Sequence, residues 1–293
     1  MKKLLRILFG CYVAAFFLQS CSVLHNPLKI KNYVEIETTA GNFVIGLYEG
    51  TPSHRDNFMQ KSSSQLYNGA LMYNAVRNSD YSFGLQRGFA EGDMLAADLA
   101  SDRTLPAEFN EKILPLRGTV AMKRVDGAKN PQKMSDANLF FLVDGSKNLD
   151  IHEIKASVAI RNRDTYKIYI DKFLALPENK ALKDSLGALR SMSTMKQYNE
   201  LYATVMKKVK PQIENDGVEL FSISEKNIDK YLERGGVPMF EDFYTVFGEI
   251  VVGMDILDKL SKVETDLNRS PKKEISIVST NVLKKKKFKK KYK

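Results

Sequence analysis

Apolar and polar positions alternate along residues 33–48, the first strongly patterned stretch of the chain. The alternation is interrupted at Ala40-Gly41-Asn42, a run of small and turn-forming residues. A period of two is typical of half-buried β-strands, and two such runs joined by a short turn form a β-hairpin. The pattern therefore predicts a hairpin. Thr51-Pro52 predicts the start of a helix, because proline fits the first helical turn.

A second strand-like stretch spans residues 244–252 and ends at Gly253. β-Branched and aromatic side chains dominate it, which favours a buried strand. The apolar positions within residues 256–260 suit one face of a short helix, and Asp255 is a suitable N-cap. We expect a buried strand that is followed directly by this helix.

The pattern changes between residues 151 and 233, where apolar positions recur with a period of about three and a half. Amphipathic stripes of this kind are typical of helices, and Pro177 and Pro211 are expected to separate them. Such stripes more often pack against other helices than carry chemistry. We therefore expect a helical segment folded on itself and on the β-rich part of the chain.

The composition is that of an ordinary globular protein, with 43% hydrophobic and 27% charged residues among 293. The formal net charge of +10 is concentrated at the two ends. Three positive charges lie near the N-terminus and eight in residues 284–293, which leaves −1 for everything between them. The basicity therefore belongs to the ends and does not indicate a nucleic-acid-binding body.

The first twenty residues have the order of an export signal: basic residues, an apolar run, and Leu18-Gln-Ser before Cys21. The apolar run is too short to span about 30 Å of hydrocarbon comfortably. Leu-x-Ser-Cys resembles a bacterial lipobox, which implies that residues 1–20 are removed and Cys21 is lipidated. Residues 21–32 would then form a tether. The alternative is an ordinary signal peptide cleaved nearby.

Several motifs follow one another in the β-rich parts of the chain. They are Asn57-Phe58, Tyr67-Asn-Gly69, Leu105-Pro-Ala-Glu-Phe-Asn110, Arg117-Gly-Thr-Val-Ala-Met122, Asn138-Leu-Phe-Phe-Leu-Val143, Gly235-Gly-Val-Pro-Met-Phe240 and Tyr244-Thr-Val-Phe-Gly-Glu249. In this order they resemble the motifs of the cyclophilin-type prolyl isomerases, over more than half of the chain. The form suggested is a bacterial lipoprotein with a helical insertion.

The resemblance implies a mainly β fold with α-helices. Residues 33–150 and 234–282 would form a closed antiparallel β-barrel capped by helices, and residues 151–233 a helical insertion in one loop. The lysine-rich run 283–293 would follow as a tail. We expect this tail to be solvated and disordered, with contact to an anionic membrane as the alternative.

The resemblance also suggests a catalytic site. Counting from Gly69 places Asn74 where the family has its principal catalytic arginine. Phe83 and Gln86 match a pocket phenylalanine and a groove glutamine, so the candidate catalytic residues are Asn74, Phe83 and Gln86. If the extra residues before Phe83 precede the strand instead, Arg77 enters the site.

Four substrate-binding residues are implied in the same way. Phe141 matches the phenylalanine of the proline pocket, Phe240 takes the place of a pocket leucine, and Tyr244 takes the place often held by a histidine. Met122 ends the Arg-Gly-Thr-x-x-Met motif. Together these side chains would form an apolar slot for a prolyl ring.

One lysine, one arginine and one histidine complete the candidates. Lys123 and Arg124 stand where the family has small and polar groove residues. His54 has no cysteine, serine or acidic partner in a motif, so we expect it on the solvated surface. Only Cys11 and Cys21 are cysteines, which gives no disulfide framework. We therefore expect no metal and no cofactor.

Rotation about an X–Pro bond crosses a barrier of about 18–20 kcal/mol through a twisted amide. Asn74 offers one neutral donor in place of a charged bidentate group, and a lost donor costs on the order of 3–4 kcal/mol. We expect a weakened peptidyl-prolyl cis-trans isomerase acting on proline-containing exported polypeptides. The alternative is a non-catalytic lipoprotein that binds proline segments or a partner.

The expected location is an exported, membrane-anchored lipoprotein on the periplasmic side or the cell surface, with the outer membrane favoured. The membrane contact would be made through lipidated Cys21 and, as an alternative to a solvated tail, the lysine run. Export also removes the opportunity to bind nucleic acid, so we expect no nucleic-acid partner.

Overall fold

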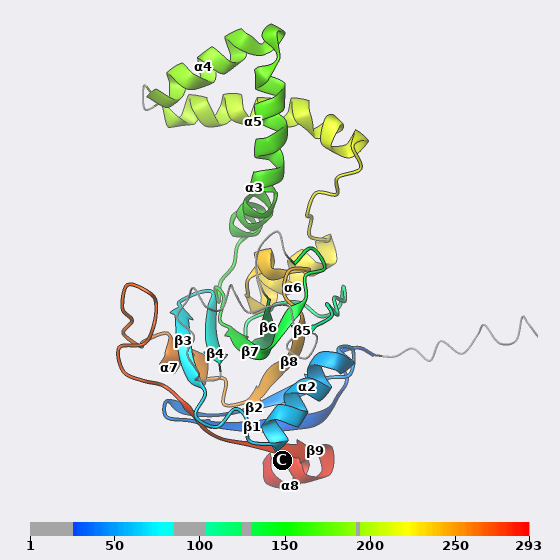
Figure 1. The fold of residues 1–293 in the computed structure, drawn as a ribbon, viewed down its shortest axis with the longest axis vertical. Coiled ribbons are helices and arrows are strands. Elements are labelled where there is room, and N and C mark those ends of the chain that lie inside the picture. The colour runs from blue at the N-terminus through cyan, green and yellow to red at the C-terminus, as the bar shows by residue number, and fades with distance from the viewer. Residues whose placement is uncertain (1–25, 85–103, 125–129, 192–193, 293) are drawn as a thin grey trace, which may run out of the picture.

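The computed structural model describes residues 26–84, 104–124, 130–191 and 194–292. The predicted leader, Cys21 and Gln86 lie outside the described residues. Figure 1 shows a β-rich body at one end of the long axis and a helical head, residues 151–215, at the other. Among the described residues, no helix is long and apolar enough to cross a membrane.

The described strands form one antiparallel sheet. They are β1 (Ile30–Thr38), β2 (Gly41–Tyr48), β3 (Leu71–Val76), β4 (Asp80–Gly84), β5 (Thr104–Leu105), β6 (Thr119–Arg124), β7 (Ser135–Val143), β8 (Val246–Val252) and β9 (Ile277–Lys284). Their order across the sheet is β3-β4-β7-β6-β8-β2-β1-β9, with β5 paired to β7. The predicted fold class, mainly β with helices, is confirmed.

Backbone hydrogen bonds bring the two edges of the sheet together. The amide of Gly69 donates to the carbonyl of Ile277 at 2.8 Å, and the amide of Ile277 donates to the carbonyl of Ala70 at 2.9 Å. The amide of Met72 donates to the carbonyl of Ile275 at 2.8 Å. Because β3 and β9 are the outermost strands in the sheet order, these bonds curl the sheet strongly and cover part of its edges.

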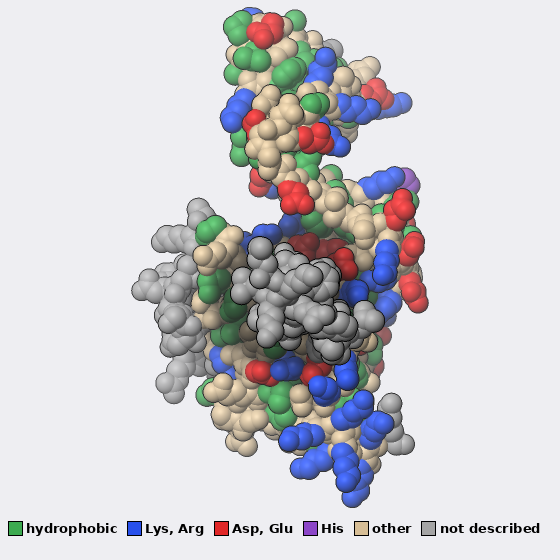
Figure 2. Space-filling model, turned by 90° about the vertical axis from the view of Figure 1, so that its right-hand side faces the viewer, with side chains coloured by type: hydrophobic (Ala, Val, Ile, Leu, Met, Phe, Trp, Pro, Cys, Tyr) green, Lys and Arg blue, Asp and Glu red, His purple; other side chains and the backbone are tan. Residues whose placement is uncertain are grey.

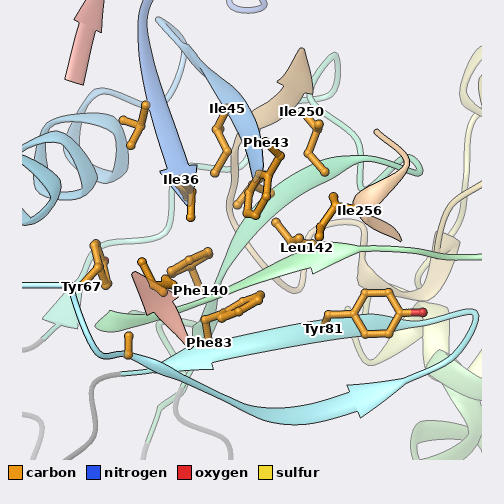
Figure 3. Packing of buried hydrophobic residues seen from close by; sticks show 14 of the residues in the cluster. Ile36, Phe43, Ile45, Tyr67, Tyr81, Phe83, Phe140, Leu142, Ile250 and Ile256 are labelled. Carbon is orange, nitrogen blue, oxygen red and sulfur yellow. The ribbon is translucent and has the colours of Figure 1, made fainter. Parts of the chain in front are cut away.

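The interior of the curled sheet holds the main hydrophobic core (Figure 3). Phe43 and Ile45 enter it from β2, and Phe83 and Phe140 from β4 and β7. Phe58 of α2 is fully buried in it, with ring centroids of Tyr67, Phe140 and Phe247 between 5.0 and 5.2 Å away. Burying this many aromatic rings supplies much of the apolar driving force of the body.

The predicted hairpin is formed by β1 and β2. Thr38 closes its turn, because its Oγ1 accepts from the amides of Ala40 and Gly41 at 3.2 and 3.1 Å and donates to the carbonyl of Gly41 at 2.6 Å. Gly41 has a φ of +146°, which a side chain would disfavour.

The helix predicted at Thr51-Pro52 is α2 (Pro52–Ser63), and it is capped from a distant loop. Thr51 makes no side-chain cap, whereas the carboxylate of Glu108 accepts from the amides of Ser53 and His54, each at 3.0 Å. These amides have no partner within the helix, and a negative charge at this end also suits the helix dipole.

His54 is fully buried, so the prediction of a solvated histidine is wrong. Its Nδ1 lies 2.7 Å from Glu108 Oε2 and its Nε2 lies 2.9 Å from Ser135 Oγ. Ser135 is itself 1% exposed, so no substrate reaches its hydroxyl. The three residues therefore join α2, the loop before β6 and the start of β7, in a structural role.

Four longer helices and two short ones lie between β7 and β8 in the described residues. They are α3 (Ile151–Ala175), η1 (Pro177–Asn179), α4 (Lys180–Ser191), α5 (Met195–Asn215), α6 (Glu225–Arg234) and η2 (Pro238–Phe240). Asp150 begins α3 with a capping box, in which its carboxylate accepts from the amide of Glu153 at 2.8 Å and the Glu153 carboxylate accepts from the Asp150 amide at 3.0 Å. The helical segment thus starts with a capped helix, the next element after β7.

The helical head has a core of its own. Its fully buried members come from α3, α4 and α5: Ile170, Leu186, Val205, Val209 and Ile213. Lower down, Ile154 of α3 and Tyr231 of α6 pack with Leu114 and Leu116 of the body. The helical segment therefore both folds on itself and packs on the β-rich body.

Two local predictions are corrected. Pro211 does not separate helices, because α5 continues through it from Met195 to Asn215. Asp255 makes no side-chain cap at α7 (Ile256–Leu260), since its carboxylate instead pairs with Lys259 Nζ at 2.8 Å. At Pro211 the buried positions Val205, Val209 and Ile213 on either side of it hold the helix together.

The lysine-rich run is also different from the expected disordered tail. Residues up to Lys284 complete β9, and the rest form α8 (Lys285–Tyr292), which lies against the body (Figure 1). Phe288 stacks on Tyr33 with ring centroids 3.8 Å apart and 2° between the planes. This docked aromatic ring fixes a helix that is too short to be stable alone.

Candidate active site

Three of the predicted substrate-binding residues form one aromatic cluster, which we call the aromatic slot. Phe141 comes from β7, Phe240 from η2, and Tyr244 from the loop before β8. The ring centroids are 5.7 Å apart for Phe141–Phe240, 5.0 Å for Phe141–Tyr244 and 4.9 Å for Phe240–Tyr244, all edge to face. Such a cluster offers apolar ring faces and edges of the size of a prolyl ring.

Phe83 and Met122, in contrast, lie in the interior of the curled sheet. Phe140 pairs with Phe83 on β4 and with Met122 on β6, and all three belong to the main core. Successive side chains of a strand point to opposite faces, so this row faces away from Phe141. The expectation that Phe83 and Met122 line the slot is therefore not met by their placement.

The row that does accompany Phe141 consists of Ser82 on β4 and Ala121 on β6, its direct cross-strand partners. Both are buried beside it. Sequence analysis missed Ser82 because the register between β4 and β7 decides which of Ser82 and Phe83 faces the slot. A bulge between Met72 and Asn74 further shifts the neighbouring strand β3.

Lys123 covers one face of the Phe141 ring. Its Nζ lies 4.6 Å from the centroid of the Phe141 ring and 5.6 Å from that of Tyr244. Asp80 holds the ammonium group in place at 2.8 Å. Because Phe141 is 0% exposed, a prolyl ring can stack on this face only after Lys123 moves aside.

Asp80 is the hub of a small polar cluster beside the slot. Its Oδ2 accepts from Ser82 Oγ at 2.7 Å and from Asn74 Nδ2 at 3.3 Å, and its Oδ1 accepts from Ser79 Oγ at 2.9 Å. Asn74, the first candidate catalytic residue, therefore lies close to Lys123 through a shared carboxylate. Sequence analysis gave Asp80 no role, because nothing in the chain order indicates that it faces Lys123.

Arg77, the alternative catalytic candidate, points elsewhere. Its Nε and Nη2 donate to the carbonyl of Ser261 at 3.2 and 2.9 Å. It lines a polar cavity with Arg117 and Asp144, on the side of α7. The alternative alignment that would bring Arg77 to the slot does not fit this placement.

Helices α3 and α6 hydrogen-bond to the loop that carries Phe240. Arg161 of α3 donates to the carbonyls of Met239 and Glu241 at 2.7 and 3.1 Å. Glu241 in turn accepts from Asn227 Nδ2 at 2.8 Å and Tyr231 Oη at 3.0 Å, both on α6. Burial raises the pKa of the Glu241 carboxyl, although these two hydrogen bonds oppose the shift.

Positive charge gathers at the mouth of the slot. The guanidinium groups of Arg124 and Arg161 lie 4.0 and 4.8 Å from the ring centroid of Phe243, and Lys133 Nζ donates to the carbonyl of Asp242 at 3.0 Å. Burial, followed by the charge of Arg124, lowers the pKa of Arg161, and burial followed by Arg161 lowers that of Lys133. These groups therefore repel one another in a partly desolvated place.

Within the described residues, no group of three or more His, Cys, Asp or Glu side chains is arranged to hold a metal ion. The chemistry of the site rests on aromatic faces, a lysine and neutral polar groups. That set suits the binding and twisting of a peptide bond more than any bond-breaking reaction.

Comparison with known proteins gives the class. The family described as cyclophilin type peptidyl-prolyl cis-trans isomerase/CLD matches residues 33–158 and 183–282. The chain therefore belongs to the cyclophilin-type family, and its enzyme class is peptidyl-prolyl cis-trans isomerase. The unmatched residues 159–182 fall within α3, η1 and the start of α4. No match was found among curated proteins.

Two solved structures resemble this one. A cyclophilin type peptidyl-prolyl cis-trans isomerase of Cryptosporidium parvum has 14% identity and a TM-score of 0.44, covering 87% of this chain and 98% of its own. A second structure of that isomerase, in the presence of the dipeptide Ala-Pro, has 14% identity and a TM-score of 0.43, covering 86% and 98%.

Proposed function

We propose that this chain is a slow prolyl isomerase whose slot is closed in the free protein. The observation that carries the proposal is the position of Lys123, whose ammonium lies over the ring of Phe141 and is held there by Asp80. A substrate must displace Lys123 before its proline reaches the slot. Binding energy used for that displacement is not available to lower the barrier.

The second reason for slow turnover is Asn74. Its neutral amide supplies one hydrogen bond beside the slot, where the family resemblance implies a charged bidentate group. Only interactions that strengthen as the amide twists accelerate rotation. Phe141, Phe240 and Tyr244 contact the ground state and the twisted state alike, so proline binding outlasts catalysis.

The proposed substrates are proline-containing polypeptides on the outer side of a bacterial membrane. Support for this location is confined to the leader-like order of the first twenty residues and the lipobox-like sequence at Cys21. A chain held there by a lipidated Cys21 would meet polypeptides as they emerge from export. The alternative function, a proline-segment binder without useful turnover, is favoured by the same closed slot.

The test is to restore the charged donor. We expect Asn74→Arg to raise kcat for a proline peptide by about tenfold or more, with a smaller change in KM, because the new group acts on the twisted amide. Asn74→Lys is the matched control that adds charge without a bidentate fork, and Arg77→Ala should leave the rate unchanged. No gain from Asn74→Arg, together with loss of turnover in Arg77→Ala, would contradict the proposal.

A further inference from the structure

α8 carries six lysines within eight residues, Lys285–Lys287 and Lys289–Lys291; all are exposed, and all but Lys291 point outward. Like charges spaced along a short helix repel one another, and a helix of this length is not stable alone. It forms here because the opposite face is apolar. Figure 2 shows the resulting cluster of basic side chains at the end of the molecule away from the helical head.

The apolar face is built for docking. Phe288 is 5% exposed and packs with Tyr33, Val44 and Leu283, while Tyr292 lies one turn further along and contacts Phe288. Tyr292 Oη and Lys291 Nζ both donate to Glu35 on β1, the latter at 2.5 Å. These contacts use one lysine and leave the others pointing outward.

The segment that enters β1 lies beside this helix. Asn32 of β1 pairs with Lys284, the last residue of β9, and Ile30 packs against the cluster around Phe288. The chain before Ile30, which the sequence predicts to be a lipid-bearing tether, therefore meets the body next to the basic face. A single lipid chain binds membranes only marginally, and a polybasic surface is the kind of second signal that makes binding stable.

We infer that α8 is a preformed membrane-contact surface for anionic phospholipid headgroups, which holds the body on the bilayer with the helical head pointing away. The inference goes beyond the proposed isomerase activity and rests on the location at a membrane that is part of the proposed function. Lysine ammonium groups attract phospholipid phosphates without a fixed geometry, which suits a fluid bilayer. The docked ring of Phe288 distinguishes this surface from a free tail, because it fixes the orientation of the body.

The experiment uses the chain from Asn26 onward, which retains every described helix and strand and contains no cysteine. Its partition onto vesicles of phosphatidylcholine with about a third phosphatidylglycerol should fall with added salt. Lys286→Gln, Lys287→Gln and Lys290→Gln together should lower this partition at least tenfold, since each lysine near an anionic surface contributes about fivefold. Lys183→Gln, Lys207→Gln and Lys208→Gln on the head remove the same charge and should change it less than twofold.

Orientation is measured by energy transfer from a dye on Glu178→Cys, at the head, to a lipid dye. Transfer should be low, and Phe288→Ala should raise it because the helix undocks while all lysines remain. Equal loss of binding in the two triple variants would overturn the inference, since net charge would then suffice. So would an unchanged transfer in Phe288→Ala, or binding to duplex DNA of equal charge concentration without binding to vesicles.

Discussion

At the scale of single residues, the slot is governed by the ion pair of Lys123 and Asp80, whose side chains are 18% and 6% exposed. Asp80 also accepts from Ser82, Asn74 and Ser79, so its carboxylate keeps three donors when Lys123 leaves. The carboxylate of Asp80 therefore stays hydrogen-bonded to neutral donors when the lysine is displaced.

We predict that Lys123→Met combined with Asp80→Asn binds proline peptides more tightly than the wild type. The double change removes the pair without leaving one charge unpaired, and a cation–π contact of about 0.5–2 kcal/mol no longer has to be broken. Affinity should rise by about 2- to 30-fold, measured by isothermal titration calorimetry. Lys262→Met, at an exposed lysine that follows α7, is the matched control and should change affinity little. Unchanged affinity in the double variant would show that Lys123 does not cover the slot in solution.

At the scale of elements, a strand and a helix position the slot from opposite sides. β7 supplies Phe141, and α3 reaches over with Arg161 to hold the loop that contains Phe240. Hydrogen bonds from a charged group contribute more than neutral ones, typically about 1.5–3 kcal/mol. Helix α3 is thus hydrogen-bonded directly to the loop that carries Phe240.

We therefore predict that Arg161→Ala weakens proline binding by about 3- to 10-fold while the melting temperature of the body changes by only a few degrees. The loop around η2 would lose the two hydrogen bonds that Arg161 donates to it, and the contacts of the guanidinium with the rings of Phe221 and Phe243 would also be lost. Arg163→Ala, two residues further along the same helix, removes an exposed charge that pairs with the neighbouring Asp164, and this variant should bind normally. Equal affinities of the two variants would mean that α3 does not position the slot.

The cap of α2 gives a pH prediction. Burial tends to raise the pKa of Glu108, but hydrogen bonds from His54 and from the amides of Ser53 and His54 outweigh it, so this pKa is lowered. A carboxyl with a lowered folded pKa stabilises the fold above its unfolded pKa and loses that contribution as pH falls through the folded value. Glu108→Gln should therefore cost about 1–2 kcal/mol near neutral pH and progressively less below about pH 4 in denaturant titrations. A constant difference across this range would contradict the assignment.

Sequence patterns located the strands and helices because periods of two and three and a half report which face is buried, as in β1, β2 and α3. They placed Phe141, Phe240 and Tyr244 in one site through the order of motifs. They misplaced Phe83 and Met122, since a strand's facing depends on register, and a shift of one residue exchanges Phe83 for Ser82. His54 was missed because its partners are 54 and 81 positions away in the chain.

At the scale of the whole molecule, the basic face of α8 and the helical head occupy opposite ends of the long axis (Figures 1 and 2). The aromatic slot lies between them, where β7 and η2 meet beneath α3. Two different surfaces therefore flank one site: a charged face that suits a bilayer and a helical projection connected to the substrate loop. Such an arrangement would leave the slot accessible when the body rests on a membrane.

The central claim is that proline binding survives where catalysis is reduced, and one paired measurement tests it most directly. The chain from Asn26 onward is titrated with an Ala-Pro-containing peptide, and its isomerisation of the same peptide is followed by exchange NMR. We predict saturable binding that Phe141→Ala abolishes. We also predict that the wild-type kcat lies about 10- to 10³-fold below that of the Asn74→Arg variant. A wild-type kcat equal to that of Asn74→Arg, or turnover that persists in Phe141→Ala, would contradict the account.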